Sequence, residues 1–173
     1  MGIWPFKSSR ANDDAELLLA AVTDASRRPA LFAAGRIPDT LEGRFEAMTL
    51  NGALALIRLR SEPGAERLAQ DFTDKLFRSF DAGLRESGIG DLSVAKHMRR
   101  LAGSFYGRLD AYTGAITAGD SVALAGALSR NALGEGHPFA DALAAYAVGV
   151  AALQAKAPLS SLFSTEGWPA PPP

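Results

Sequence analysis

The chain has 173 residues, of which 47% are hydrophobic and 21% are charged, as in ordinary globular proteins. This length suits one folded domain with a core. The net charge of -1 argues against a nucleic-acid partner, and the absence of cysteine excludes disulfides, thiolate nucleophiles and cysteine-ligated metals.

Residues 1–13 are expected to form a flexible N-terminal segment. They lack the run of roughly seven apolar residues that a secretory signal needs, and the acids that follow do not suit an organellar presequence. The segment does combine apolar and basic side chains, a composition that suits a membrane interface. Peripheral membrane contact is therefore a secondary hypothesis, beside a disordered or core-docking tail. The side chains concerned are Ile3, Trp4, Phe6, Lys7 and Arg10.

Apolar periodicity predicts a first helix over residues 14–27, which Pro29 prevents from continuing. The linker 29–38 is expected to hold a short turn. A second helix should begin at Asp39 or Thr40, where Asp39 and Glu42 resemble a capping box, and end by Ser61. Apolar residues nearly encircle this helix, which predicts a central position.

A third helix is predicted over residues 64–86 from apolar residues at four-residue spacing. The turn that follows contains Gly88 and Gly90, which are expected to supply left-handed backbone angles, and Asp91, which is expected to balance Arg85 or Lys96. These three positions are interpreted as structural. A fourth helix should begin at Ser93, acting as N-cap, and end at residue 118.

A fifth helix is predicted over residues 120–133, and a sixth from Pro138 to Lys156 with the apolar spacing of an antiparallel bundle. A C-terminal tail is expected over residues 158–173, and its Pro-rich end, Pro169 to Pro173, should be extended and unpacked, while residues 160–168 are left unassigned. No run of apolar residues reaches the roughly 20 that a membrane-spanning helix needs. The expected fold is all-α: a single compact bundle of about six helices over residues 14–157.

The fourth helix is predicted to have two contrasting faces. The core face gathers large apolar residues at helical spacing. It comprises Val94, Met98, Leu101, Phe105, Leu109, Tyr112 and Ile116. The opposite face carries Lys96, Arg99, Arg100, Gly103, Gly107 and Asp110.

Gly103 and Gly107 need an explanation, because each glycine destabilises a helix by about 1 kcal/mol relative to alanine. Without Cβ atoms they leave a shallow groove in which a partner helix could dock beside basic side chains. The predicted partner-binding surface is Lys96, Arg99, Arg100, Gly103, Tyr106, Gly107 and Arg108. The alternative is that a helix of the same bundle fills the groove and the basic residues form a solvated face.

The stretch from Phe80 to Arg108 resembles the signature of the ubiquinol-cytochrome c chaperone family, in its short alphaproteobacterial form. The run FYGR, residues 105–108, carries most of the resemblance. The other matching positions are Phe80, Asp81, Leu84, Arg85, Glu86, Gly88 to Leu92, Val94, Lys96 and Met98. The similarity extends from about the first predicted helix to the sixth.

The resemblance implies an α-helical assembly factor that binds newly made cytochrome b, or another subunit, while the cytochrome bc1 complex is built. It implies no catalysis and no cofactor. A small assembly partner subunit is a further candidate partner. The implied location is the bacterial cytoplasm, with peripheral contact at the cytoplasmic face of the inner membrane.

Two rival hypotheses remain open. One is a helical lipid- or quinone-binding protein or enzyme, with a pocket between the second, third and fourth helices. The other is a homodimeric structural module whose interface is its own glycine groove. His97 and His137 lack metal-ligand spacing and are interpreted as surface or capping residues, so no metal site is predicted.

Overall fold

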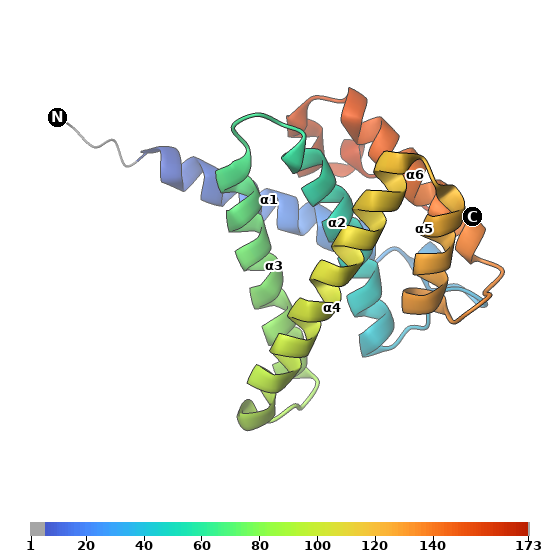
Figure 1. Ribbon diagram of the computed structural model, residues 1–173. Coiled ribbons are helices and arrows are strands. Elements are labelled where there is room, and N and C mark those ends of the chain that lie inside the picture. Colours follow the sequence, from blue (N-terminus) through green and yellow to red (C-terminus); the bar gives the residue numbers. More distant parts are fainter. Residues whose placement is uncertain (1–5, 173) are drawn as a thin grey trace.

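The computed structural model describes the backbone of residues 6–172 and the side chains from residue 10 onward. Within that part of the chain there are six α-helices and no strand (Figure 1). The helices are α1 (Phe6–Ser26), α2 (Leu41–Arg60), α3 (Glu66–Glu86), α4 (Asp91–Ala118), α5 (Ser121–Leu128) and α6 (Ala140–Lys156). The expected all-α bundle is confirmed.

Helix α2 occupies the centre of the bundle, as its apolar pattern predicts. It packs against α1, α3, α4 and α6, and most of its residues between Gly43 and Leu59 are buried. Burial on every side explains why this helix needs apolar residues around almost its whole circumference. The other helices each bury one face against it or against a neighbour.

The N-terminal boundary differs from the expectation, because α1 already begins at Phe6. No proline or glycine interrupts the sequence between Phe6 and Ser26, so nothing stops the helix from extending toward the N-terminus. Lys75 of α3 binds Glu16 at 2.8 Å and joins the two helices at this end. Ile3 and Trp4, named for membrane contact, lie outside the described residues.

Two helix starts differ from the predicted caps. Thr40, not Asp39, caps α2: its Oγ1 accepts a hydrogen bond from the amide of Gly43 at 3.1 Å, while Asp39 binds Arg44. Helix α4 begins at Asp91 behind Gly90, so Ser93 lies inside the helix and does not cap it. Gly88 has the expected left-handed backbone with φ 85°, whereas Gly90 is extended with φ -66°. The prediction for Gly90 was wrong.

The connection between α5 and α6 is also more complex than predicted. The end of the expected fifth helix is a π-helical turn, Ser129–Leu133, and α6 begins at Ala140, after Pro138. The ring Nδ1 of His137 accepts a hydrogen bond from the amide of Phe139 at 3.1 Å. His137 therefore has the capping role expected of it. Within residues 6–172 no helix is long and apolar enough to cross a membrane.

The C-terminal tail is packed on the bundle. Two short 3-10 helices, Leu159–Phe163 and Thr165–Gly167, occupy the stretch left unassigned from sequence and bring Trp168 into the core, where it is 1% exposed. The Pro-rich end was expected to be unpacked, and its contacts contradict that expectation. Arg28, two residues after the end of α1, donates to the carbonyl oxygens of Trp168 and Pro169, and Arg36 donates to the carbonyl oxygen of Pro172. Proline lacks an amide donor but keeps its carbonyl acceptor, and this explains how a Pro-rich tail is held.

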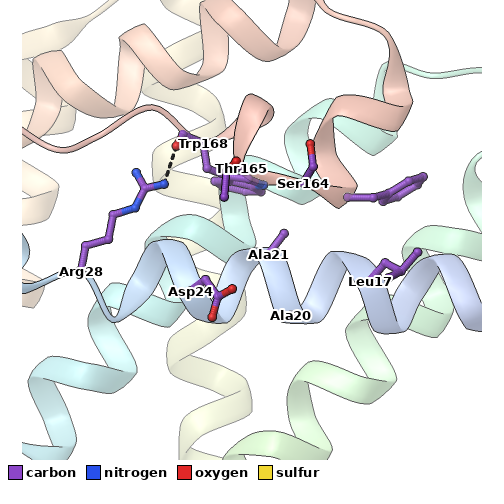
Figure 2. Close-up of a pocket in the computed structure, with 9 residues that line it drawn as sticks. Leu17, Ala20, Ala21, Asp24, Arg28, Ser164, Thr165 and Trp168 are labelled. Atoms are coloured by element: carbon purple, nitrogen blue, oxygen red, sulfur yellow. Dashed lines mark hydrogen bonds between the residues drawn. The ribbon is translucent and has the colours of Figure 1, made fainter.

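A small crevice of about 140 Å³ lies between α1 and the C-terminal turns. Figure 2 shows Leu17, Ala21 and Asp24 on the α1 side, with Thr165 and Trp168 opposite. The Arg28 guanidinium lies at one end, bonded to the backbone of Trp168. The crevice marks where the tail packs on α1.

The Arg28 contacts predict a measurable contribution to stability. Replacing Arg28 with Ala should lower the free energy of unfolding by about 2 kcal/mol, because hydrogen bonds from a charged group to the tail carbonyls are lost. Urea denaturation followed by circular dichroism measures this change. The matched control is Arg27→Ala. Because Arg27 is exposed, this substitution should change the free energy of unfolding by no more than about 0.5 kcal/mol. Equal stability of the two variants would show that Arg28 does not hold the tail.

Candidate partner-binding site

Helix α4 places its predicted core face as expected. Val94, Phe105, Leu109 and Tyr112 are buried, and Met98, Leu101 and Ile116 pack against the core while partly exposed. The helix contacts both α2 and α3. Around its circumference, α4 therefore has a side toward α2, a side toward α3 and a face that points outward.

The outward face of α4 is open. Gly103 and Gly107 are exposed, and a Cβ atom built at either position would meet no atom within 4 Å. No described helix of the bundle occupies the surface at Gly103 and Gly107. For residues 6–172 this excludes the alternative in which a helix of the same bundle fills the groove. The name glycine face is used below for Lys96, Arg99, Gly103, Gly107 and Asp110.

The basic residues at the start of α4 are available to a partner. Lys96, Arg99 and Arg100 are all exposed, and none forms an ion pair or hydrogen bond with another side chain in the described part of the chain. Their positive charges therefore remain uncompensated by a contacting carboxylate. Such a patch favours an anionic partner surface.

Tyr106 lies at the border with α3. Its ring is stacked on Phe77 with a centroid distance of 5.9 Å, and the residue is 47% exposed. Phe77 in turn contacts Phe105 and Phe80, and Phe80 contacts Phe45 of α2. This aromatic cluster joins α2, α3 and α4, with Tyr106 as its exposed member.

Arg108 is not a free surface cation. Its Nε and Nη2 atoms both bind the carboxylate of Glu46 at 2.6 Å, and its Nη1 donates to the carbonyl of Ser104. The side chains of Arg108 and Glu46 are 18% and 8% exposed. Arg108 thus fixes α4 to α2 and lies on a different side of α4 from the glycines.

The environment of this ion pair shifts the pKa of two groups. Burial raises the pKa of Glu46, and the hydrogen bonds and charge of Arg108 oppose that increase without cancelling it. Burial also raises the pKa of Tyr112 to about 12, with the Glu46 charge as the next cause. Both shifts follow from placing polar groups in the interior between α2 and α4.

A large groove, of about 1290 Å³, lies between the C-terminal parts of α1 and α3 and the N-terminal parts of α2 and α4. Its apolar lining includes Phe32, Leu41, Phe45, Met48, Phe80, Leu84, Ile89 and Leu101. Its charged lining includes Arg27, Asp39, Glu42, Arg44, Glu46, Glu86, Arg100 and Arg108. The rival hypothesis of a pocket between the second, third and fourth helices therefore indicated the right place.

The structure divides the predicted surface residues between two regions. Arg100 and Arg108 line the groove, whereas Lys96, Arg99, Gly103 and Gly107 form the adjoining outward face. Sequence reasoning missed the role of Glu46 and the part of the groove that α1 lines, because both depend on helices far apart in the chain. One signal was present: Glu46 lies in a helix whose apolar pattern predicts burial on nearly every side, and a buried carboxylate requires a partner.

His97 also lines the groove, and its Nδ1 lies 2.9 Å from the carbonyl oxygen of Ser93 one turn earlier. In the described residues, no three His, Asp or Glu side chains gather in a way that could hold a metal ion. The chemistry of the groove is thus that of an apolar surface with mixed charges at its edges, which suits binding of an amphipathic segment.

The Glu46–Arg108 pair predicts a strongly non-additive stability effect. Glu46→Ala should lower the free energy of unfolding by about 3 kcal/mol, because it leaves the partly buried Arg108 charge without its partner. The double variant Glu46→Met with Arg108→Met should cost much less than the two single variants together. A double-mutant cycle by urea denaturation measures this coupling. Additive losses would contradict the assignment.

A pH titration gives a second test of the pair. The Glu46 carboxyl should titrate above its ordinary value of 4.5, and its pKa should rise further in Arg108→Met, because the opposing cation is removed. In the pH window between the ordinary and the raised pKa, the folded chain binds more protons than the unfolded chain. The free energy of unfolding should therefore fall as pH rises through that window, and the window should widen in Arg108→Met.

Carbon-13 NMR of the Glu46 carboxyl measures the pKa directly, and urea denaturation across the acid range measures the linked stability. Asp39, which binds Arg44 at the surface, is the internal comparison because its pKa is lowered by that arginine. A Glu46 pKa that falls in Arg108→Met would overturn the interpretation.

The chain resembles known proteins over most of its length. Residues 33–167 match the family model described as ubiquinol-cytochrome C chaperone. The solved crystal structure of the Cbp3 homolog from Brucella abortus is 37% identical in sequence, with a TM-score of 0.80, and the match covers 91% of this chain and 89% of that one. No curated protein sequence matches significantly. The chain belongs to the ubiquinol-cytochrome c chaperone family.

Proposed function

We propose that this protein is a non-catalytic assembly chaperone that binds newly made cytochrome b, or another subunit of the cytochrome bc1 complex, through the groove between α1, α2, α3 and α4. Membership of the ubiquinol-cytochrome c chaperone family supports the assembly role. The groove is the observation that carries the choice of site. The proposed place of action is the bacterial cytoplasm, at the inner membrane where such a client is inserted.

The groove has the dimensions for a segment of a polypeptide. Its volume of about 1290 Å³ exceeds the range of roughly 300–1,000 Å³ that is usual for small-molecule sites. An α-helix with its side chains is about 10–12 Å in diameter, and amphipathic helices commonly bind in grooves with apolar floors. A client helix would cover the partly exposed rings of Phe32 and Phe45 and the side chain of Met48.

The groove is also stiff where a client would lie. The rings of Phe45 and Phe80 contact each other in a tilted arrangement with centroids 5.0 Å apart, and the Arg108 guanidinium lies over the Phe45 ring with its carbon 5.8 Å from the centroid. The bidentate contact of Arg108 with Glu46 fixes that guanidinium. A preformed wall binds a client with less loss of conformational entropy than a mobile one.

The glycine face is the second candidate surface. It adjoins the groove along α4, and its exposed backbone at Gly103 and Gly107 permits close approach of another helix. Lys96, Arg99 and Arg100 would meet acidic groups of that partner. A small assembly partner subunit that binds here would leave the groove free for the client.

The experiment places single charges in the groove at positions that the fold tolerates. Leu41 is 40% exposed and Ile89 is partly exposed, so Leu41→Asp and Ile89→Asp should fold normally. Each should reduce the cytochrome b captured with the tagged chaperone by at least about tenfold, because an unpaired charge would enter an apolar interface. Quantitative co-purification from cells that express the bc1 complex measures capture.

The matched control is Val122→Asp, which adds the same charge at an 81% exposed position on α5, outside the groove. Gly103→Leu tests the glycine face in the same assay. Loss of capture with Gly103→Leu and normal capture with both groove variants would move the client to the glycine face. A lipid or quinone retained in the native mass spectrum, with no cytochrome b captured, would contradict the chaperone proposal.

A further inference from the structure

The α3–α4 hairpin ends in an exposed apolar side chain. The connected ends of α3 and α4 extend beyond the other helices at the bottom of Figure 1. The name tip is used for residues 87–92 at this end. Leu92 in the tip is 100% exposed, the most exposed of the large apolar side chains described. A single exposed leucine is ordinary on a protein surface, so its meaning depends on the side chains that surround it.

Three basic side chains follow Leu92 along α4. Lys96 and Arg99 lie on the same face of the helix as Leu92, at one and about two turns along its axis, and Arg100 lies beside them. With a rise of about 1.5 Å per residue, Lys96 is about 6 Å and Arg99 about 10 Å along the axis from Leu92. The order from the tip inward is therefore an apolar residue, then cations.

Acidic groups near the tip offset only part of this charge. Asp91 is bound by Arg85, which also binds Asp81 at 2.7 Å, so these three residues form a network of their own with one net negative charge against the three positive charges of Lys96, Arg99 and Arg100. Glu86 is exposed but lines the groove, on the side toward α2. On the outward face of α4, the first carboxylate after Lys96 belongs to Asp110.

We propose that the tip docks on an anionic lipid bilayer, with Leu92 in the interfacial region and Lys96, Arg99 and Arg100 at the level of the lipid phosphates. An apolar residue below a ring of cations matches the polarity gradient of a bilayer surface. Anionic headgroups attract each nearby Lys or Arg, and long basic side chains reach phosphates while their stems stay in a less polar layer.

Other occupants fit the same surface less well. An RNA would contact the cations, but its phosphate surface would leave Leu92 in water. A second copy related by a two-fold axis at the tip itself would bring Lys96, Arg99 and Arg100 against the same three cations. The observation that favours a membrane is the combination of the fully exposed leucine with the unpaired cations.

The inference does not depend on the proposed client site, because it concerns purified protein and lipid alone. The absence of cysteine from the sequence permits a direct probe. Leu92→Cys carries an NBD fluorophore at the tip, and Val122→Cys carries the same fluorophore at an 81% exposed position on α5. The full chain is mixed with vesicles of phosphatidylcholine alone or of phosphatidylcholine with phosphatidylglycerol.

Anionic vesicles should shift NBD emission at position 92 to the blue and leave position 122 unchanged, and vesicles of phosphatidylcholine alone should shift neither. Lys96→Glu with Arg99→Glu should reduce the partition coefficient at least roughly thirtyfold, and added salt should weaken binding of the unmodified chain. Leu92→Ser, which keeps all charges, should reduce partitioning by a smaller factor. Circular dichroism and thermal melting check that each variant folds.

Three results would overturn the proposal. The first is flotation with anionic vesicles without a spectral shift at position 92, which would assign the contact to another part of the chain. The second is a blue shift that structured RNA produces and vesicles do not. The third is a shift that appears with protein concentration in the absence of lipid, together with a dimer mass by light scattering.

Discussion

The orientation of α4 about its own axis is the constraint on which both candidate surfaces depend. Its apolar face packs into the core, and the ion pair between Glu46 and Arg108 links it to α2 through two hydrogen bonds of 2.6 Å, with the tilted rings of Phe45, Phe80 and Phe105 beside the pair. With this orientation fixed, the groove side carries Arg100 and Arg108, and the glycines face outward. A rotated α4 would bury the cations or cover the groove. The apolar face of α4 and the ion pair together set the geometry of both candidate surfaces, although the pair is itself too enclosed to bind a partner.

Helix α4 shows what the sequence could predict and what it could not. Local periodicity was sufficient to assign its core face and its open face, because both follow from the spacing of residues on one helix. The role of Arg108 was not predictable in this way, since Glu46 lies 62 residues away in the chain. The same reason applies to Arg28 and the tail, which are separated by about 140 residues. The groove needs four helices at once, so no single segment could indicate its shape. The family itself was predicted correctly from the sequence, because the residues that carry the resemblance are close together in α3 and α4.

The two proposed surfaces are compatible in space. Ile89 and Arg100 line the groove close to the tip, so the groove extends toward the end of the hairpin. A tip held at the bilayer surface would place one end of the groove near the headgroups. A client segment that leaves the membrane, or is about to enter it, could then pass into the groove over a short distance. In this arrangement, the tip would bind the lipid surface while the groove binds the membrane-protein client. The two proposed interactions are tested by separate experiments.

The attachment of the C-terminal tail to α1 has a consequence for folding kinetics. Helical bundles with short loops fold rapidly because most of their contacts are local in sequence. Here the hydrogen bond from Arg28 to Pro169 closes a loop of 141 residues, and Trp168 enters the core only when that loop is closed. The entropy of loop closure must be overcome before these contacts stabilise the chain. The contacts of the tail therefore raise the mean sequence separation of the contacts in the fold, and the domain should fold more slowly than a bundle of the same size whose contacts are all local.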